Sequence, residues 1–373
     1  RSSSRLNSRN PHRLRVEGFC LSGARKNQRE NTFSFLCIML LRGYDACLIA
    51  RRFQMLTLLK LLADGAFHSG QVLGDALGIS RSAVWKQLQQ LEADLGIDVH
   101  KVRGRGYRLA TPISLLSPYG IEQSGFPANW SVRTYDSIDS TNAEAARLIT
   151  QGVAMPVLVV AEQQTSGRGR RGRKWVSPFA ENLYYSLVLR IDGGMRQLEG
   201  LSLLVGLAVM NVLRDMGVQG AGLKWPNDVL VGRQKIAGIL LELIGDPADV
   251  CHVIIGIGVN VNMRSTSEVD QLWTSVRLET GGLVDRNQVA ARISTQLEAL
   301  MTVHRKEGFA AFQKEWERGH LWQGAAVKLL SGVGVVEGVV LGVDSLGALR
   351  LEVNGVEKSF SGGELSLRLR DDS

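Results

Sequence analysis

The chain has 373 residues, of which 45% are hydrophobic, and this length allows two or three domains with buried cores. Its net charge of +8 comes entirely from residues 1–54, which hold 11 basic and 3 acidic residues and leave 33 of each sign in the remainder. The remainder is neutral, so the overall charge does not indicate that the whole molecule binds nucleic acid.

The first 54 residues show no sustained helical or strand period and contain three of the four cysteines. Their hydrophobic run at 33–41 is too short to span a membrane. We predict that this segment is disordered or translated from upstream of the true start, so that a chain beginning at Met55 keeps all activity. Only Cys251 remains downstream, which excludes a disulfide framework and fits a reducing cytoplasm.

Residues 55–109 have the pattern of a winged helix-turn-helix. Apolar residues at helical spacing predict helices over 55–64 and 70–77, the second ending at Gly78, and a third helix capped by Ser80. We expect these side chains to be buried: Val72, Leu73 and Leu77 in the second helix, and Val84, Leu88 and Leu91 in the third.

A hairpin with a basic tip follows, because strand-like residues at 99–102 and 107–109 flank Arg103-Gly104-Arg105-Gly106. In a winged module of this kind the third helix would enter the major groove of DNA while wing cations meet phosphates. The alternative is a protein-interaction module with the same fold. The polar helix face beside the basic wing favours DNA.

The next region, to about residue 320, alternates apolar runs with polar turns. Strand-like runs lie at 157–161, 183–189, 235–243 and 253–261, and 201–213 has the length and spacing of a buried helix. We predict a mixed sheet backed by helices. From Gly324 onward, short Val/Leu/Gly segments with turns such as Asn354-Gly355 predict a small β-barrel.

The segment 167–175, Gly-Arg-Gly-Arg-Arg-Gly-Arg-Lys-Trp, holds five cations and three glycines in nine residues. Charge repulsion and glycine entropy oppose its ordering, so we expect a loop that is mobile until an anion neutralises it. It is a candidate clamp for phosphate or carboxylate. A solvated basic loop or a nucleic-acid contact is the alternative.

Four more segments place polar groups between apolar elements. Residues 136–142 open a helix whose N-terminus could bind an anion or carbonyl beside Ser140 and Thr141, or could simply be capped. Residues 224–228, Lys-Trp-Pro-Asn-Asp, offer oxygen ligands of the kind that Mg²⁺ accepts, or a plain turn. Residues 235–242 begin with a half-buried lysine that needs an anion, and 256–262, Gly-Ile-Gly-Val-Asn-Val-Asn, let a ligand approach the backbone.

No Ser/His/Asp or Cys/His arrangement and no GxxxxGK[ST] sequence stands out, so a covalent protein nucleophile is not indicated. What remains is charge stabilisation by a basic loop, two lysines and a metal around an apolar pocket. Such a set of charged groups suits nucleotidyl transfer.

The segments at 167–175, 224–228, 235–242 and 256–262, in this order, resemble the biotin protein ligase family, and the resemblance covers about residue 55 to the end. With the winged helix in front, the chain is similar to the bifunctional bacterial members that also repress biotin synthesis genes. The resemblance implies an α+β multidomain fold. Its expected parts are an extension over 1–54, a winged helix-turn-helix over 55–115, a ligase domain over 116–322 and an SH3-like β-barrel over 323–373.

The resemblance implies that biotin is activated with ATP as biotinyl-5′-AMP and passed to one lysine of the biotin carboxyl carrier protein of acetyl-CoA carboxylase. The catalytic residues would be Arg170 and Lys235. Biotin would contact Ser140, Thr141, Asn142, Gln164, Gly167, Arg168, Gly169, Arg170, Lys235, Gly238, Gly256 and Gly258. ATP would contact Arg173, Trp175, Lys224, Asn227, Asp228 and Asn260, with Asn227 and Asp228 also as Mg²⁺ ligands.

The resemblance further implies a homodimer that forms when the adenylate is bound and then binds palindromic operator DNA, with no membrane partner. DNA would contact Ser80, Arg81, Ser82, Lys86, Arg103 and Arg105. Gly362-Gly363-Glu364 would help the ATP site or the docking of the carrier protein.

Two alternatives remain open at this point. A lipoate-type ligase has the same catalytic fold, but the intact Gly-Arg-Gly-Arg-Arg-Gly loop favours biotin. A transcription factor that only senses biotin would not need both Lys235 and the full arginine loop.

Overall fold

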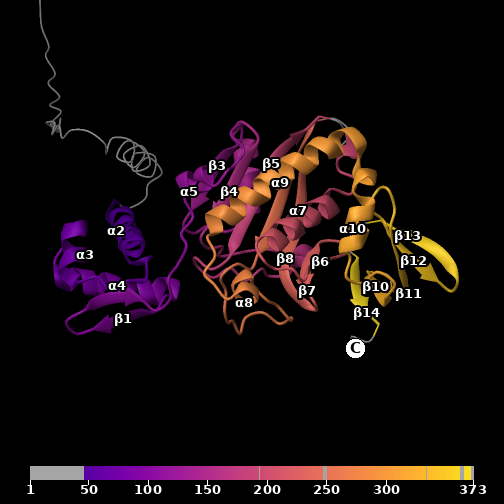
Figure 1. Ribbon diagram of the computed structural model, residues 1–373. Coiled ribbons are helices and arrows are strands. Elements are labelled where there is room, and N and C mark those ends of the chain that lie inside the picture. The colour runs from indigo at the N-terminus through magenta and orange to yellow at the C-terminus, as the bar shows by residue number, and fades with distance from the viewer. Residues whose placement is uncertain (1–45, 193, 247–249, 333, 362–364, 371–373) are drawn as a thin grey trace, which may run out of the picture. The chain divides into compact units, whose positions relative to one another are not determined.

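Figure 1 shows the computed structural model of the chain, which describes residues 46–192, 194–246, 250–332, 334–361 and 365–370. The chain divides into two units, Arg1–Leu58 and Leu59–Ser373, and the division falls within the first described helix, α2 (Ala46–Leu62). This helix begins ahead of Met55, where regular structure was expected to start, because residues 46–54 contain no glycine or proline to end a helix. None of the described helices is both long and apolar enough to cross a membrane.

The predicted helix-turn-helix is confirmed in α3 (Gly70–Leu77) and α4 (Arg81–Leu95). Gly78 ends α3 with φ +67°, and the Ser80 side chain accepts a hydrogen bond from the Ala83 N–H at the start of α4. The third helix buries the three side chains expected of it: Val84, Leu88 and Leu91. The prediction that Val72 is buried was wrong, because its side chain is 57% exposed. Val72 lies on the solvent side of this short helix, whereas its neighbour Leu73 faces inward.

The basic wing is an antiparallel hairpin of β1 (Val99–Val102) and β2 (Gly106–Leu109), as expected. Its base is tied to the chain before α3, because His68 and Tyr107 exchange two backbone hydrogen bonds of 2.8 Å. Gly106 has φ +101°, and a side chain there would collide with the His68 backbone. Glycine is therefore required where the wing meets the helical part.

The central domain is built on a seven-stranded mixed sheet in the order β3-β4-β5-β9-β8-β7-β6. The β3 and β4 strands are parallel, and all other neighbours are antiparallel. The strands are β3 (Ser131–Tyr135), β4 (Val157–Ala161), β5 (Leu183–Ile191), β6 (Ala221–Lys224), β7 (Asp228–Val231), β8 (Gln234–Gly245) and β9 (Cys251–Val259). The predicted strand runs and the mixed sheet are confirmed.

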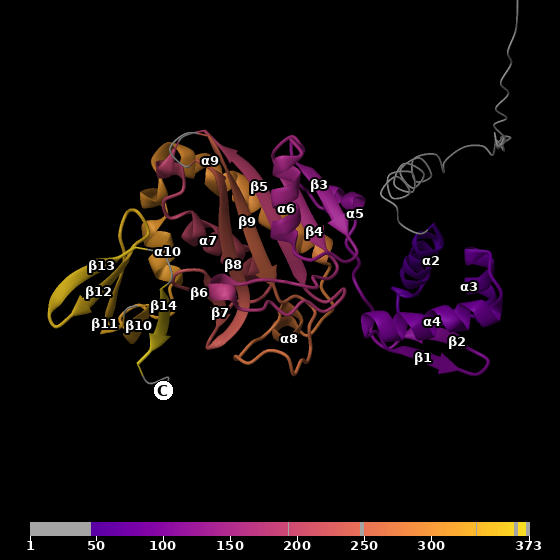
Figure 2. The same ribbon diagram turned by 180° about the vertical axis from the view of Figure 1, so that it is seen from behind.

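Helices cover both faces of this sheet. Figures 1 and 2 show α7 (Leu201–Asp215) and α9 (Arg286–Glu307) on one face and α6 (Thr141–Thr150) on the other. Leu158 and Val160 of β4 join the core under α7, whereas Val157 and Val159 pack with α6. A strand buried on both faces needs an unbroken apolar run, which β4 has. The other α-helices described in this region are α5 (Pro118–Gln123), α8 (Val276–Thr280) and α10 (Gln313–Gly319).

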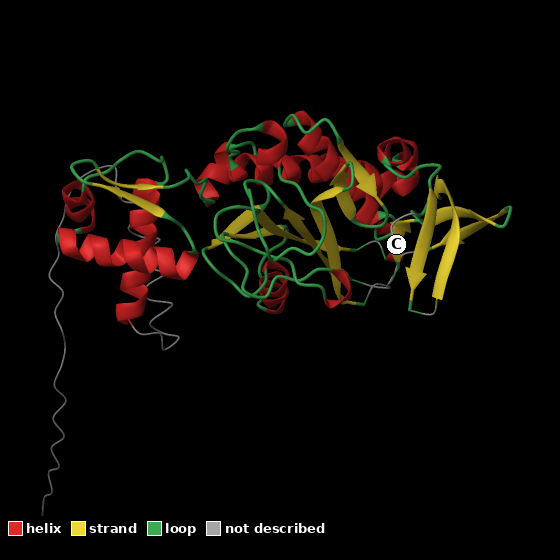
Figure 3. Ribbon diagram, turned by 90° about the horizontal axis from the view of Figure 1, so that it is seen from below, coloured by secondary structure: helices red, strands yellow, loops and turns green. Residues whose placement is uncertain are grey.

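The C-terminal strands form a five-stranded antiparallel sheet in the order β13-β12-β11-β10-β14. Figure 3 shows strands of this sheet, at the right of the view, apart from those of the central sheet. They are β10 (Ala326–Ser331), β11 (Gly334–Val343), β12 (Leu349–Val353), β13 (Val356–Phe360) and β14 (Ser366–Leu369). Asn354 and Gly355 both have positive φ, as a tight hairpin turn requires, and join β12 to β13. The α10 side chains Gln313 and Glu317 bond the Val343 backbone, which fixes this sheet to the central domain.

Candidate active site

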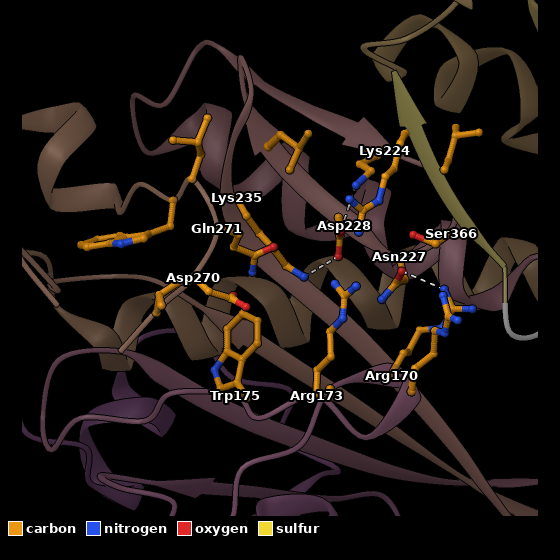
Figure 4. A pocket seen from close by; sticks show the side chains of 18 of the residues that line it. Arg170, Arg173, Trp175, Lys224, Asn227, Asp228, Lys235, Asp270, Gln271 and Ser366 are labelled. Atoms are coloured by element: carbon orange, nitrogen blue, oxygen red, sulfur yellow. Dashed lines mark hydrogen bonds and ion pairs between the residues drawn. The ribbon is translucent and has the colours of Figure 1, made fainter. Parts of the chain in front are cut away.

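Two adjoining cavities lie where the basic loop meets the sheet. The larger cavity, of about 970 Å³, is lined by the basic loop, by residues 224–228 and by residues 365–368 ahead of and within β14. The narrow pocket, of about 60 Å³, is lined by the start of α6, by Gln164 and by the glycines of β8 and β9. Both cavities share Arg170, Trp175, Asn227 and Lys235 in their walls. Figure 4 shows these four side chains around the larger cavity.

The basic loop is folded back on itself as a tight hairpin. Its backbone closes through hydrogen bonds from Gly169 N to Arg173 O (2.7 Å) and from Trp175 N to Gly167 O (2.9 Å). A side chain at Gly167 would collide with the Trp175 carbonyl, so glycine is needed at that point. Arg171 has φ +58°, a sparsely populated conformation for a residue with a side chain. The mobility of the basic loop in the absence of a bound anion stays a prediction.

Arg170 connects the loop to two distant segments. Its Nη1 donates to Asn227 Oδ1 (2.9 Å) and its Nη2 donates to the Leu365 carbonyl (3.4 Å). The Asn227 Nδ2 in turn donates to the Ile239 carbonyl (2.9 Å), so the acceptor is held in place by β8. Figure 4 shows the Arg170 guanidinium against Asn227 at the edge of the larger cavity. An anion that enters from the cavity would meet this guanidinium.

A carboxylate between two lysines forms the wall of the larger cavity. Lys235 Nζ lies 2.6 Å from Asp228 Oδ1, and Lys224 Nζ lies 3.7 Å from Asp228 Oδ2. Burial would raise the pKa of Asp228, but Lys235 and Lys224 together hold it below its ordinary value. Burial lowers the pKa of Lys224, an effect that Asp228 opposes. Both lysine side chains lie beside the cavity, and the anion expected beside Lys235 is supplied by Asp228.

Trp175 covers two of the predicted glycines. A side chain at Gly258 would collide with the indole of Trp175, and one at Gly238 would be in tight contact with Trp175 and Lys235. Lys235 Nζ lies 5.5 Å from the centre of the indole. A cavity of about 60 Å³ is far below the 300 Å³ or more that is common for ligand sites. A ligand that fills the narrow pocket must therefore displace part of its lining.

The start of α6 forms the inner end of the narrow pocket. Thr141 donates through N and Oγ1 to Gln164 Oε1 (2.8 and 3.0 Å), and Gln164 Nε2 donates to Ser177 Oγ (3.2 Å). Asn142 is 5% exposed and lies so close to Gly256 that a side chain there would collide with it. Ser140 caps α6, so the capping alternative is confirmed; a ligand contact by its hydroxyl stays a prediction.

Asn260 is brought to the larger cavity, but its amide nitrogen is engaged with the protein. Its Nδ2 donates to the carbonyls of Lys235 (3.2 Å) and Thr274 (3.0 Å). These bonds fix the segment after β9 beside β8. The predicted contact of Asn260 with ATP stays a prediction.

Several residues of the site were not predicted from the sequence. Ser186 is fully buried on β5, where its Oγ lies 2.8 Å from Thr141 Oγ1, and a serine inside the apolar run of that strand was the available signal. Arg368 and Trp322 line the larger cavity, although no local pattern marks them. Lys224 Nζ lies 4.9 Å from the centre of the Trp322 ring. Gly362-Gly363-Glu364 lie outside the described residues.

The six predicted DNA contacts are all exposed on the helix-turn-helix and its wing: Ser80, Arg81, Ser82, Lys86, Arg103 and Arg105. The Arg105 guanidinium lies 4.3 Å from the centre of the Phe67 ring, which steadies the wing tip. Trp85 was not predicted as part of this surface. It is 40% exposed on α4, and the centre of its ring lies 5.3 Å from Lys101 Nζ of the wing. An exposed tryptophan on this face indicates a contact surface.

Comparisons with known proteins agree across the three regions. Residues 135–260 match the Biotin/lipoate A/B protein ligase family, 51–108 an HTH domain, and 324–368 the Biotin protein ligase C terminal domain. The chain is 42% identical to the "Bifunctional ligase/repressor BirA" of Salmonella typhimurium over 84% of this chain and 97% of that protein. It is 34% identical to the protein of the same name from Bacillus subtilis, over 80% and 94% of the two chains. The solved biotin protein ligase from Aquifex aeolicus in complex with biotin and ATP is 32% identical, with a TM-score of 0.57, over 64% and 99%.

Proposed function

We propose, from the premise that this chain belongs to the biotin protein ligase family, that its narrow pocket holds biotin and its larger cavity holds ATP. The chain is an ATP-dependent biotin ligase that forms biotinyl-5′-AMP and transfers biotin to a carrier-protein lysine, and its helix-turn-helix domain supports a repressor role. The assignment of the two cavities is supported by the side chains that line both of them: Arg170, Trp175, Asn227 and Lys235. The two substrates would react across this wall.

The first half-reaction brings anions together. An oxygen of the biotin carboxylate attacks the α-phosphorus of ATP, and pyrophosphate leaves. Lys235 borders both cavities and would neutralise the carboxylate and the α-phosphate as they meet, while Arg170 would donate to the phosphate oxygens. Lys224 and Arg368 line the larger cavity and would meet the leaving pyrophosphate. In the second half-reaction the carrier lysine attacks the anhydride carbonyl and AMP leaves.

Magnesium would be held by Asn227 and Asp228 together with the phosphates of the nucleotide. The donor types fit, since Mg²⁺ needs only one or two oxygen ligands from the protein. The metal would compete with Arg170 for Asn227 Oδ1 and with Lys235 for Asp228 Oδ1. Among the described residues no group of three or more His, Cys, Asp or Glu side chains could hold a metal by itself. The metal would supply further charge neutralisation on the phosphates.

The assignment is tested by incubating the protein with ATP, labelled biotin and the biotinyl domain of a carboxyl carrier protein. We expect label on the carrier lysine, and none after chelation of Mg²⁺ with EDTA until the metal is restored. Labelled lipoate in place of biotin is the control. Transfer of lipoate instead of biotin, or transfer that is insensitive to EDTA, would contradict these assignments.

The helix-turn-helix is proposed to bind operator DNA as part of a homodimer that forms when the adenylate is bound. The support is the exposed polar face of α4 beside a basic wing, with Trp85 available for apolar contact with a thymine methyl. With these two partners, we propose that the protein acts in the cytoplasm. Sedimentation with and without biotin and ATP tests dimer formation.

Replacing Arg103 with alanine should weaken binding to duplex DNA of any sequence. Arg103 lies at the exposed tip of the wing and would neutralise a phosphate, so the slope of log K against log salt should fall by about one. Fluorescence anisotropy between low and high salt measures the slope. A matched control is Lys306→Ala at the exposed end of α9, and an unchanged slope for Arg103→Ala would remove this residue from the interface.

A further inference from the structure

Glu242 of β8 binds two segments of the narrow pocket at once. Its Oε2 accepts a hydrogen bond from Asn142 Nδ2 (2.7 Å), and its Oε1 lies 3.7 Å from Arg168 Nη2 of the basic loop. We propose that Glu242 is a positioning residue of the ligase, which orients Asn142 toward biotin and holds the basic loop closed over the pocket. This inference rests on the proposed location of biotin.

The Asn142 amide has its orientation fixed from both sides. Ser186 Oγ donates to Asn142 Oδ1 (2.5 Å), and Asn142 Nδ2 donates to the Glu242 carboxylate. A carboxylate accepts only, so it forces the nitrogen of the amide to face β8 and the oxygen to face β5. Asn142 is 5% exposed at the inner end of the narrow pocket, where the polar group of a ligand must match whatever orientation the amide has.

The ion pair between Glu242 and Arg168 of the basic loop is weaker than the hydrogen bond to Asn142. A weak ion pair can break and re-form as the loop opens and closes. The Arg168 side chain is 54% exposed and that of Glu242 is 35% exposed, and an ion pair in such surroundings shifts an equilibrium by only a few-fold. A contact of this strength changes how often the loop is closed without locking it. The loop must open for biotin to enter and for the adenylate to meet the carrier lysine.

The position of Glu242 in the sheet argues against an incidental surface charge. It is the only charged residue among residues 236–245, and the residue opposite it on β9 is Ile254. It therefore has no charged partner across the strand pair. Both oxygens instead reach segments that lie about 100 and 70 residues away in the sequence, and both segments line the narrow pocket.

Two substitutions separate the two roles. Glu242→Gln keeps an oxygen that can accept from Asn142 but removes the charge that attracts Arg168, whereas Glu242→Ala removes both contacts. For Glu242→Gln we expect a KM for biotin within about twofold of the wild type, together with a few-fold faster escape of biotinyl-5′-AMP and faster tryptic cleavage within residues 167–175. For Glu242→Ala we expect the KM for biotin to rise about tenfold as well.

The coupling of Glu242 to Arg168 is tested with Arg168→Gln and the double variant. If the two residues act as a pair, the double variant should release adenylate no faster than either single variant. The matched control is Glu357→Gln, which breaks the exposed Arg350–Glu357 ion pair of the C-terminal sheet and should leave all readouts unchanged. Thermal unfolding of each variant accompanies the kinetics.

Effects of the two single variants that multiply in the double variant, or an unchanged KM for biotin in Glu242→Ala, would overturn the inference. Wild-type transfer of biotin is measured in the same series. Its absence would count against the proposed function, whereas normal wild-type transfer without coupling would count against the role of Glu242 alone.

Discussion

Replacing Arg170 with glycine is expected to slow adenylate formation and to release biotinyl-5′-AMP into solution. Arg170 closes the loop against Asn227 and the Leu365 carbonyl, and its guanidinium lies in the wall shared by both cavities. Loss of one well-placed donor from a crowded anionic transition state costs about two to three powers of ten in rate. The same loss opens the lid that keeps the reactive anhydride from bulk lysines.

Two readouts follow the consequences of Arg170→Gly. Single-turnover release of pyrophosphate gives the rate of the first half-reaction, and labelling of an unrelated lysine-rich protein gives the escape of adenylate. Arg171→Gly is the matched control: it removes the same charge from the same loop and relieves a positive φ, so a smaller effect is expected. Normal kinetics with strict choice of the carrier lysine in Arg170→Gly would refute the role assigned to this arginine.

Replacing Lys235 with methionine is expected to slow the first half-reaction by about two to three powers of ten. Lys235, like Arg170, borders both cavities, and its Nζ lies 2.6 Å from Asp228 Oδ1 and 5.5 Å from the centre of the Trp175 ring. Methionine is one atom shorter than lysine and is unbranched, so it can still pack on the indole, but it cannot neutralise the carboxylate and α-phosphate. Rapid-quench measurement of biotinyl-5′-AMP formation gives the rate.

The fold should survive the loss of Lys235, because Asp228 keeps Lys224 as a second cation. The pKa of Asp228 should rise in the variant, since the nearer of the two positive charges is gone. Lys314→Met, at an exposed position of α10, is the control for loss of a lysine elsewhere. Adenylate formation at the wild-type rate in Lys235→Met would show that another group supplies the charge.

The sequence by itself determined the features that depend on neighbours a few residues away. Helical spacing, a terminal glycine and a capping serine predicted α3 and α4, and the apolar run at 157–161 predicted the strand β4. The order of the basic loop, the Lys-Trp-Pro-Asn-Asp turn and the glycine-rich strands predicted the ligase domain. These signals are local because helices and strands bury side chains with short, fixed periods.

Only the tertiary structure decided which side chains meet. Arg170 contacts the Leu365 carbonyl 195 residues further along the chain, and Asn142 contacts Glu242 at a separation of 100. Asp228 proved to be the partner of Lys235, and the Asn260 amide nitrogen donates to the Lys235 carbonyl. Contacts of this range depend on the order of strands in the sheet and on the packing of the C-terminal strands beside it, and no local period in the sequence records either.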